Sequence, residues 1–284
     1  MFTLKIESKL GTVELTHDLK NYAVIGIQGL TPPPTTINTA VVGNIDGSFF
    51  NSARVESRNL VITIVLRGDI EGNRQRLYRI FPRKAPVTVY FKNKNRDVKI
   101  SGYVETLEGD LFVQKEQIQI SILCPRPYWE NIEAISQEIS DIQPLFEFPF
   151  DIEEDNPIEI SSISSTPIYV YDNVGDVETG AVFKFIVNGT VSGLTLTNFT
   201  TSAYIGFNYT FAAGDIITLS TVQGGLYARL ERNNSVINLL NYLTSGSTWI
   251  KLAIGENELL YTVMSGNDED VRCIITATTL YGGV

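Results

Sequence analysis

The residues that could carry out chemistry are few and scattered along the chain. The single histidine, His17, stands beside Asp18, and the two cysteines, Cys124 and Cys273, are far apart in sequence. One histidine cannot hold zinc alone, and a serine nucleophile would need His17 as its base. We expect His17 to be an exposed residue at a turn and both cysteines to be core residues, because free cysteine is usually buried. No catalytic residue, metal ligand or cofactor is therefore predicted.

Carboxylates form two clusters along the sequence. The first contains Glu153, Glu154, Asp155 and Glu159, and the second contains Asp268, Glu269 and Asp270. Glycoside hydrolysis needs two carboxyl groups about 5–9 Å apart in a cleft, whereas adjacent acids on turn-like sequence point outward. We expect solvated loops at both places, with a weak Ca²⁺ site or a catalytic pair as the alternatives. No GxSxG, HExxH or Walker sequence is present, so the chain is not predicted to be an enzyme.

Composition indicates a folded, strand-rich protein. The chain has 284 residues, of which 43% are hydrophobic and 19% charged, with 14 Phe and 13 Tyr. No apolar run is long enough for a transmembrane helix, and the first residues do not resemble a secretory signal. Residues 1–130 hold 17 Lys and Arg against 13 Asp and Glu, whereas residues 131–284 hold 5 against 19. Either the acidic half is simply solvated, or the basic half faces partners and the acidic half faces water.

The first half of the sequence predicts strands and one helix. Strands are expected at 2–7, 22–28, 60–66 and 87–91, and residues 98–107 are expected to pair with 117–124 across a turn. Both faces of the 60–66 strand are apolar, so we expect it to be buried on both sides. Asp69 can cap a helix that ends near Phe81 before Pro82, with Arg74, Arg76 and Arg79 projecting away from its apolar face.

The second half is dense in short strands separated by turns that contain Gly or Asn. Strands are expected at AVFKFIV, GLTLTNF, YIGFNYTF, DIITLS, TWIKLAI, ELLYTVM and VRCIITAT, a spacing typical of a β-sandwich. A carbohydrate-binding module is the rival function for this half, because exposed aromatic rings can stack on sugars. Its candidate platforms are Trp249, Tyr204, Tyr209, Tyr227, Tyr242 and Tyr261, although Trp249 alternates with its neighbours as a core residue would.

An ordered set of motifs resembles the distal tail proteins of siphophages. Residues 67–129 resemble the belt domain of that family in four pieces: Phe81–Pro82, Val87–Phe91, Gly102–Glu105 and Cys124–Trp129. The segment Leu145–Ile152 is similar to the family's interdomain junction. Gly255–Val263 and Leu280–Val284 are similar to its second domain. No room remains after the junction for an inserted carbohydrate module, which puts direct binding to the host wall in doubt.

The resemblance implies a mainly β fold with a β-sandwich or split-barrel belt domain that carries one helix, and a galectin-like β-sandwich. We expect the belt domain at 1–130, a linker at 131–150 and the second domain at 151–284. The resemblance implies a homo-hexameric ring around a DNA channel in the virion, assembled in the host cytoplasm. Its partners would be the tail tube protein, a tail-associated hub or lysin protein, and receptor-binding or other baseplate proteins. The alternative is a carbohydrate-binding module for cell-surface adhesion.

The residues suggest where such a ring would make its contacts. Consecutive prolines keep a segment extended, and the stretch from Val41 to Phe50 ends in two aromatic residues, so both segments could form a contact arm. The basic helix could add a protein interface or simply face solvent. The predicted interface residues are Pro32, Pro33, Pro34, Phe49, Phe50, Arg74, Arg76 and Arg79.

Overall fold

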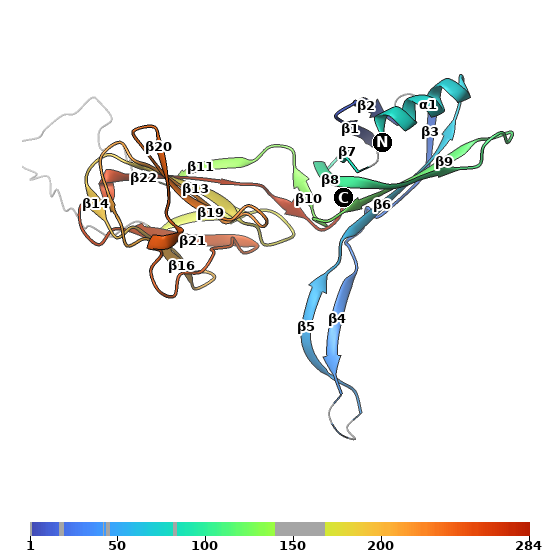
Figure 1. Cartoon of the computed structure of the whole chain (residues 1–284). Helices are drawn as coiled ribbons and strands as arrows, with labels where there is room; N and C mark the ends of the chain where they lie inside the picture. The colour runs from blue at the N-terminus through green and yellow to red at the C-terminus, as the bar shows by residue number, and fades with distance from the viewer. Residues whose placement is uncertain (1, 17–19, 42, 44–45, 82–83, 140–167) are drawn as a thin grey trace, which may run out of the picture. The chain divides into compact units, whose positions relative to one another are not determined.

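The chain divides into two compact units in the computed structural model (Figure 1). The structure describes residues 2–16, 20–41, 43, 46–81, 84–139 and 168–284. Unit 1 contains residues 1–133 together with Leu280–Val284, and unit 2 contains Ala134–Thr279. Unit 2 is therefore an insertion in unit 1, because the chain leaves unit 1 once and comes back. The predicted linker extends beyond the described residues, so the predicted domain limits stay a prediction.

Unit 1 is built on one nine-stranded sheet, a separate two-stranded hairpin and one helix. Most of the sheet follows the order β2-β1-β7-β8-β9-β6-β3, and β10 joins β8 to β23. The elements are β1 (Thr3–Ser8), β2 (Gly11–Glu14), β3 (Tyr22–Gln28), β4 (Thr35–Ala40), β5 (Phe49–Val55), β6 (Arg58–Leu66), α1 (Ile70–Ile80), β7 (Pro86–Lys92), β8 (Asp97–Gly109), β9 (Gln117–Cys124), β10 (Trp129–Asn131) and β23 (Leu280–Tyr281).

The predicted helix and the predicted hairpin of unit 1 are confirmed. The side chain of Asp69 accepts a hydrogen bond from the Gly72 amide at 3.1 Å, which caps the first turn of α1. Leu77 and Ile80 of α1 are buried in the core of unit 1. Strands β8 and β9 pair antiparallel as predicted, but through Tyr103–Gly109 of β8, because Val98–Gly102 pair with β7 and not with β9. No helix among the described residues is long and apolar enough to cross a membrane.

Strand β6 differs from its prediction. Leu60, Ile62, Ile64 and Leu66 are buried, but Val61, Thr63 and Val65 on the other face are only half-buried. The expectation that both faces would be buried is therefore wrong for the single chain. Val61 and Val65 therefore leave a partly exposed apolar strip on this face of the sheet, as antiparallel sheets commonly have one face toward solvent.

Unit 2 contains a six-stranded sheet in the order β11-β22-β13-β18-β19-β20 and a four-stranded sheet in the order β12-β21-β15-β16. A short β14–β17 pair completes it. The elements are β11 (Ile135–Ile139), β12 (Tyr169–Asn173), β13 (Ala181–Val187), β14 (Val191–Ser192), β15 (Thr195–Asn198), β16 (Ala203–Gly206), β17 (Thr210–Phe211), β18 (Ile216–Ser220), β19 (Tyr227–Arg232), β20 (Ser235–Asn238), β21 (Gly255–Thr262) and β22 (Val271–Ala277), with 3-10 turns η1 (Leu240–Tyr242) and η2 (Asp268–Asp270).

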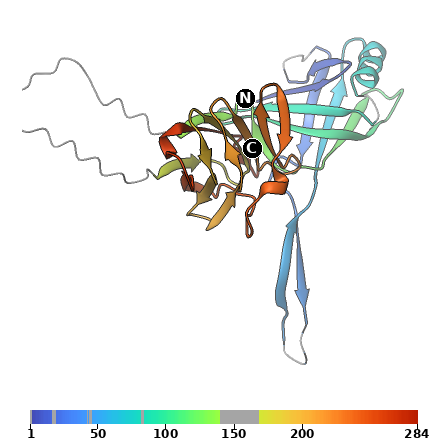
Figure 2. The same ribbon diagram turned by 60° about the vertical axis from the view of Figure 1, so that its left-hand side comes forward.

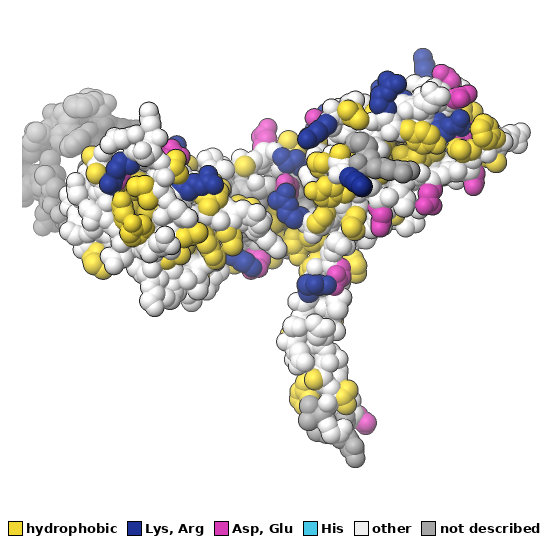
Figure 3. Space-filling model, viewed as in Figure 1, with side chains coloured by type: hydrophobic (Ala, Val, Ile, Leu, Met, Phe, Trp, Pro, Cys, Tyr) yellow, Lys and Arg dark blue, Asp and Glu magenta, His cyan; other side chains and the backbone are white. Residues whose placement is uncertain are grey.

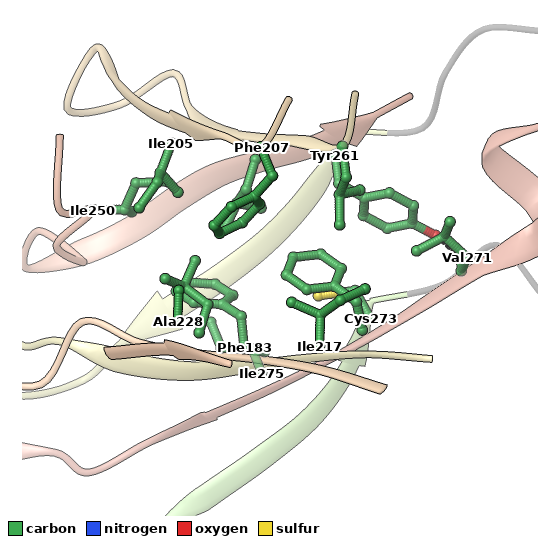
Figure 4. Close-up of a cluster of buried hydrophobic side chains, with 14 of the residues drawn as sticks. Phe183, Ile205, Phe207, Ile217, Ala228, Ile250, Tyr261, Val271, Cys273 and Ile275 are labelled. Atoms are coloured by element: carbon green, nitrogen blue, oxygen red, sulfur yellow. Dashed lines mark hydrogen bonds between the residues drawn. The ribbon is translucent and has the colours of Figure 1, made fainter. Parts of the chain in front are cut away.

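The two larger sheets of unit 2 enclose its core, as Figure 4 shows. Phe183 and Ile275 point inward from the six-stranded sheet, and Ile205 and Tyr261 point inward from the four-stranded sheet. The Tyr261 hydroxyl donates to the carbonyl of Val271 at 2.7 Å, so its polar end is satisfied inside the core. The predicted β-sandwich and the mainly β fold are confirmed, whereas the galectin-like assignment stays a prediction.

The predicted strand TWIKLAI is wrong, and a nearby hairpin was missed. Within this segment only Leu252 pairs, in an isolated bridge with Thr179. The carboxamide of Asn257 instead accepts from the Ala253 amide at 2.8 Å and donates to the Ala253 carbonyl at 2.8 Å. These bonds replace a strand ladder. The missed hairpin β19–β20 turns at Asn233 and Asn234, which have φ of 49° and 61°, the conformation that two-residue hairpin turns favour.

Candidate assembly surface

A two-stranded hairpin leads away from the sheet of unit 1. Strands β4 and β5 pair only with each other, and we call them, with the turn that joins them, the arm. Figures 1 and 2 both show the arm projecting from the sheet as a separate ribbon. An isolated two-stranded hairpin is marginally stable in water. The arm therefore needs either a strong root or a partner surface.

Large apolar side chains on the arm are exposed to solvent. The exposed fraction is 62% for Ile37, 74% for Val41, 57% for Phe49 and 67% for Phe50. Figure 3 shows apolar side chains toward the far end of the arm, well away from the sheet. Adjacent exposed aromatic and aliphatic residues mark protein contact sites. The sequence prediction placed Phe49 and Phe50 in a contact arm, and the structure brings both to the start of β5.

Hydrogen bonds and an ion pair close the root of the arm beside Pro34. The Glu56 amide donates to the Pro34 carbonyl at 2.9 Å, and the Thr36 hydroxyl donates to the Glu56 carboxylate at 2.7 Å. Arg54 donates to the same carboxylate at 2.9 Å, and this bond is the main reason why the pKa of Glu56 is lowered. Pro32 and Pro34 are exposed, and Pro33 is half-buried. We call residues 29–34, which connect β3 to β4, the link, and its three prolines keep it extended.

Helix α1 carries the predicted basic residues, but they do not share a surface. Arg76 and Arg79 are exposed, and Figure 3 shows basic side chains over this helix. The expectation that Arg74 projects outward is wrong. Its side chain is only 9% exposed and pairs with Glu116 at 2.8 Å. Arg74 is buried because the β8–β9 loop, which is far from α1 in sequence, supplies the carboxylate that pairs with it.

The pair Arg74–Glu116 also fixes the β8–β9 loop. The Phe112 amide donates to the Glu116 carboxylate at 2.9 Å, and the Arg74 guanidinium lies 5.4 Å from the centre of the Phe112 ring. The Phe112 backbone has φ of 61°, which is strained for a bulky residue. The bond from Phe112 is the first cause, and the contact with Arg74 a further cause, of a lowered pKa for Glu116.

A pH dependence follows from Glu116. A carboxyl whose pKa is lowered by folding stabilises the fold above its unfolded pKa, and this stabilisation is lost as pH falls through the folded pKa. We expect the unfolding temperature of unit 1 to fall between pH 5 and pH 3, and to fall less in Glu116→Gln. Trp129 fluorescence in a Trp249→Phe background reports unit 1, and the control is Glu108→Gln, which removes an exposed carboxylate of β8. Equal acid sensitivity in Glu116→Gln and the parent would contradict the assignment.

The main order of strands in the sheet of unit 1 ends at two strands, and one of them presents an exposed apolar residue. The order of paired strands ends at β2 on one side and at β3 on the other. In β3, Ile25 is 56% exposed and lies at a bulge between Val24 and Gly26. Edge strands can pair with a strand from another chain, so a neighbouring copy could extend the sheet at either end.

The candidate sugar platforms of unit 2 do not form one surface. Tyr261 is buried, and Trp249 is partly buried against the core, although the fully buried residues of its segment are Ile250 and Leu252. The Tyr209 ring packs on Tyr242 with ring centres 4.7 Å apart. Tyr227 lies on the outward face of the six-stranded sheet beneath Arg229. Tyr204 is exposed, and its hydroxyl donates to the Ser245 carbonyl at 2.8 Å.

The residues considered for chemistry are separated or lie outside the described residues. His17 and the cluster Glu153–Glu159 lie outside them. Cys124 and Cys273 are buried in different units, as predicted, and burial raises the pKa of both thiols, to about 12 for Cys124. Asp268 accepts from the Val263 amide at 2.7 Å, which is a turn-capping bond. No cluster of three potential metal ligands occurs among the described residues.

Comparison with known proteins agrees with the motifs. Residues 174–274, within unit 2, match the family model of the siphovirus-type tail component, C-terminal domain. The crystal structure of the Dit protein of phage SPP1, described as a paradigm of the hub adsorption apparatus in phages that infect Gram-positive hosts, aligns over 99% of each chain with a TM-score of 0.69 and 13% identity.

Two structures of the phage P2 baseplate in its activated conformation also align. They were determined with Ca and with Sr, cover 97% of this chain and 98% of theirs, have a TM-score of 0.49 and are 12% and 11% identical. No curated protein sequence matches the chain. The resemblance to phage distal tail proteins is confirmed by the family match and by the fold shared with SPP1 Dit.

Proposed function

We propose that this chain is a structural distal tail protein of a phage or phage-like tail, which forms a hexameric ring through unit 1. The ring joins the tail tube to the tip or hub around a channel for DNA, and it supports receptor-binding parts. The observation that carries this proposal is the arm, whose apolar residues have no cover in a single chain. The copy number of six comes from the family resemblance.

The geometry of unit 1 suits a head-to-tail ring. The two ends of the sheet, β2 and β3, are different strands, so contact between β3 of one copy and β2 of the next would leave both ends available again. Such heterologous contacts close into a ring when the rotation between copies allows it. The arm and the half-buried face of β6 supply two further apolar surfaces for the same neighbour. Each copy would then use surfaces that are incomplete in isolation.

The remaining surfaces have separate roles in this proposal. Arg76 and Arg79 on α1 would contact an acidic surface of an adjoining tail protein. Unit 2, whose half of the sequence is strongly acidic, would face solvent and the other baseplate proteins. The chain would act by binding and carry out no reaction. Its place of action would be the tail tip of the virion.

Light scattering and negative-stain microscopy of the purified full chain test the proposal. We expect a species of six times the mass of the chain at high micromolar concentration, and six-fold rings in the images. Salt should weaken the ring only slightly, because apolar contacts are insensitive to charge screening. A strict monomer at all concentrations would refute self-assembly. Strong glycan binding by the monomer would then favour the adhesion alternative.

A further inference from the structure

The segment Leu280–Val284, which we call the return segment, completes unit 1 although it follows all of unit 2 in the chain. This differs from the sequence analysis, which grouped the segment with the second domain. Trp129 and Glu130 of β10 pair with Tyr281 and Leu280 of β23. The Arg96 guanidinium lies 4.2 Å from the centre of the Tyr281 ring and donates to the Gly283 carbonyl. The return segment is therefore bound by both its backbone and its side chains.

The return segment lies against the link between the sheet and the arm. The Val284 amide donates to the Leu30 carbonyl at 3.1 Å. A Cβ atom added at Gly283 would come within 3.1 Å of both the Leu30 carbonyl oxygen and the Pro32 ring, so a side chain there requires the link to shift by a few tenths of an ångström. A Cβ atom at Gly282 would be 3.9 Å from Pro32, an ordinary distance. The two neighbouring glycines thus differ in how tightly they meet the link.

One buried cation holds the return segment and the link together. Arg58 begins β6, directly after the arm, and only 1% of it is exposed. Its guanidinium donates to the carbonyls of Gly29 and Thr31 in the link, the latter at 2.7 Å. It also donates to Gly282 of the return segment at 2.5 Å and to Pro127 at 2.6 Å. Every nitrogen of the guanidinium is thereby used, and two of the bonded carbonyls lie in the link.

We propose that the return segment, bound through Arg58, positions the arm for assembly, so that a chain becomes competent to assemble only after the return segment has docked. Arg58 is the positioning residue. The proposal rests on the proposed function, in which the arm docks on a neighbouring copy. Arg58 and Gly282 are 224 positions apart. A chain in which unit 2 is unfinished therefore lacks the bond from Arg58 to Gly282 and the bond from Val284 to Leu30.

The physical basis is the weakness of the arm by itself. A hairpin that is packed on nothing else in its chain takes its direction from its root. If the link residues Gly29–Pro32 lose their contacts, the arm samples many directions, and docking must then order it at an entropic cost. A docked return segment removes that cost before assembly. The arm of an incomplete chain would bind neighbours weakly, which disfavours rings that contain unfinished subunits.

The test compares two glycine variants of the full chain. We expect Gly283→Val to displace the return segment and to lower the fraction of chain in rings at least tenfold, whereas Gly225→Val in unit 2, where an added Cβ atom meets nothing closer than 3.8 Å, should assemble like the parent. Trp129 fluorescence in a Trp249→Phe background verifies that unit 1 remains folded at the assay temperature. If the valine variant unfolds unit 1, Gly283→Ala replaces it, and loss of rings or normal assembly is read in the same way. Normal assembly of a folded Gly283 variant would overturn the proposal.

A second measurement separates this inference from the ring itself. Hydrogen exchange of the arm is measured in the double variant Phe49→Ser/Phe50→Ser, which removes docking, with and without Gly283→Val. We expect Gly283→Val to speed exchange of the Glu56 amide, which bonds to Pro34, at least tenfold. Unchanged exchange would refute the positioning role even if rings form. If Gly283→Val speeds exchange of the Glu56 amide but the parent chain never forms rings, the positioning role is supported and the proposed function fails.

Discussion

Replacing Phe49 and Phe50 by serine is expected to abolish assembly while leaving the monomer as stable as the parent. Both rings are mostly exposed in the single chain, so their removal takes little from its own core. Burying a Phe side chain at an interface contributes about 1.5–3 kcal/mol. Two per interface amount to about 4 kcal/mol, which weakens each contact roughly a thousandfold because 1.4 kcal/mol is a factor of ten. Light scattering at micromolar concentration measures the loss directly.

The matched control for the arm variant lies in unit 2. Phe199 is also exposed, at 46%, and Phe199→Ser should leave the ring intact. The unfolding temperature of Phe49→Ser/Phe50→Ser should stay within about 2 °C of a monomeric parent, since surface substitutions change stability by about 0.5 kcal/mol or less. Rings of normal stability in the double variant would show that the arm is not the contact. Loss of rings with Phe199→Ser as well would point to a general effect of removing exposed aromatic rings.

Local patterns were sufficient for α1, β9 and β22. Asp69 three residues before Gly72 defines the start of α1, and the alternation in QIQISILC defines β9 with its buried face. The alternation in VRCIITA likewise gives the buried face of β22. These predictions hold because each rests on neighbouring residues and on the period of a single element. The exposed aromatic pair of the arm was predicted for the same reason, from residues adjacent in sequence.

The contacts that position the arm could not be predicted, because they join distant residues. Arg58 precedes an apolar strand, where a charged residue normally indicates a solvated end, yet its partners at Pro127 and Gly282 bury it. Arg74 was assigned to the surface because its partner, Glu116, lies in another element. Side-chain charge alone does not reveal whether a carbonyl or a carboxylate from elsewhere will meet it. The Asn233–Asn234 turn, in contrast, was a local signal that could have been used.

Arg58→Met is expected to destabilise unit 1 by about 3 kcal/mol or more and to leave unit 2 unchanged. The substitution keeps much of the side-chain volume but leaves the carbonyls of Gly29, Thr31, Pro127 and Gly282 without their shared donor. A buried polar group that loses its partner costs about 1–3 kcal/mol, and water can reach only some of these carbonyls. A loss of this size lowers the unfolding temperature by roughly 10 °C for a unit of this length.

The chain allows the two units to be followed separately in that experiment. It has two tryptophans, Trp129 in unit 1 and Trp249 in unit 2, so Trp249→Phe and Trp129→Phe backgrounds each report one unit. The matched control is Arg54→Met, because Arg54 is an exposed arginine of the arm in a surface ion pair worth about 1 kcal/mol or less. Equal, small effects of both substitutions would mean that the buried guanidinium is dispensable. A shift of the Trp249 transition in Arg58→Met would mean that the two units unfold together, because Arg58 makes its bonds within unit 1 alone.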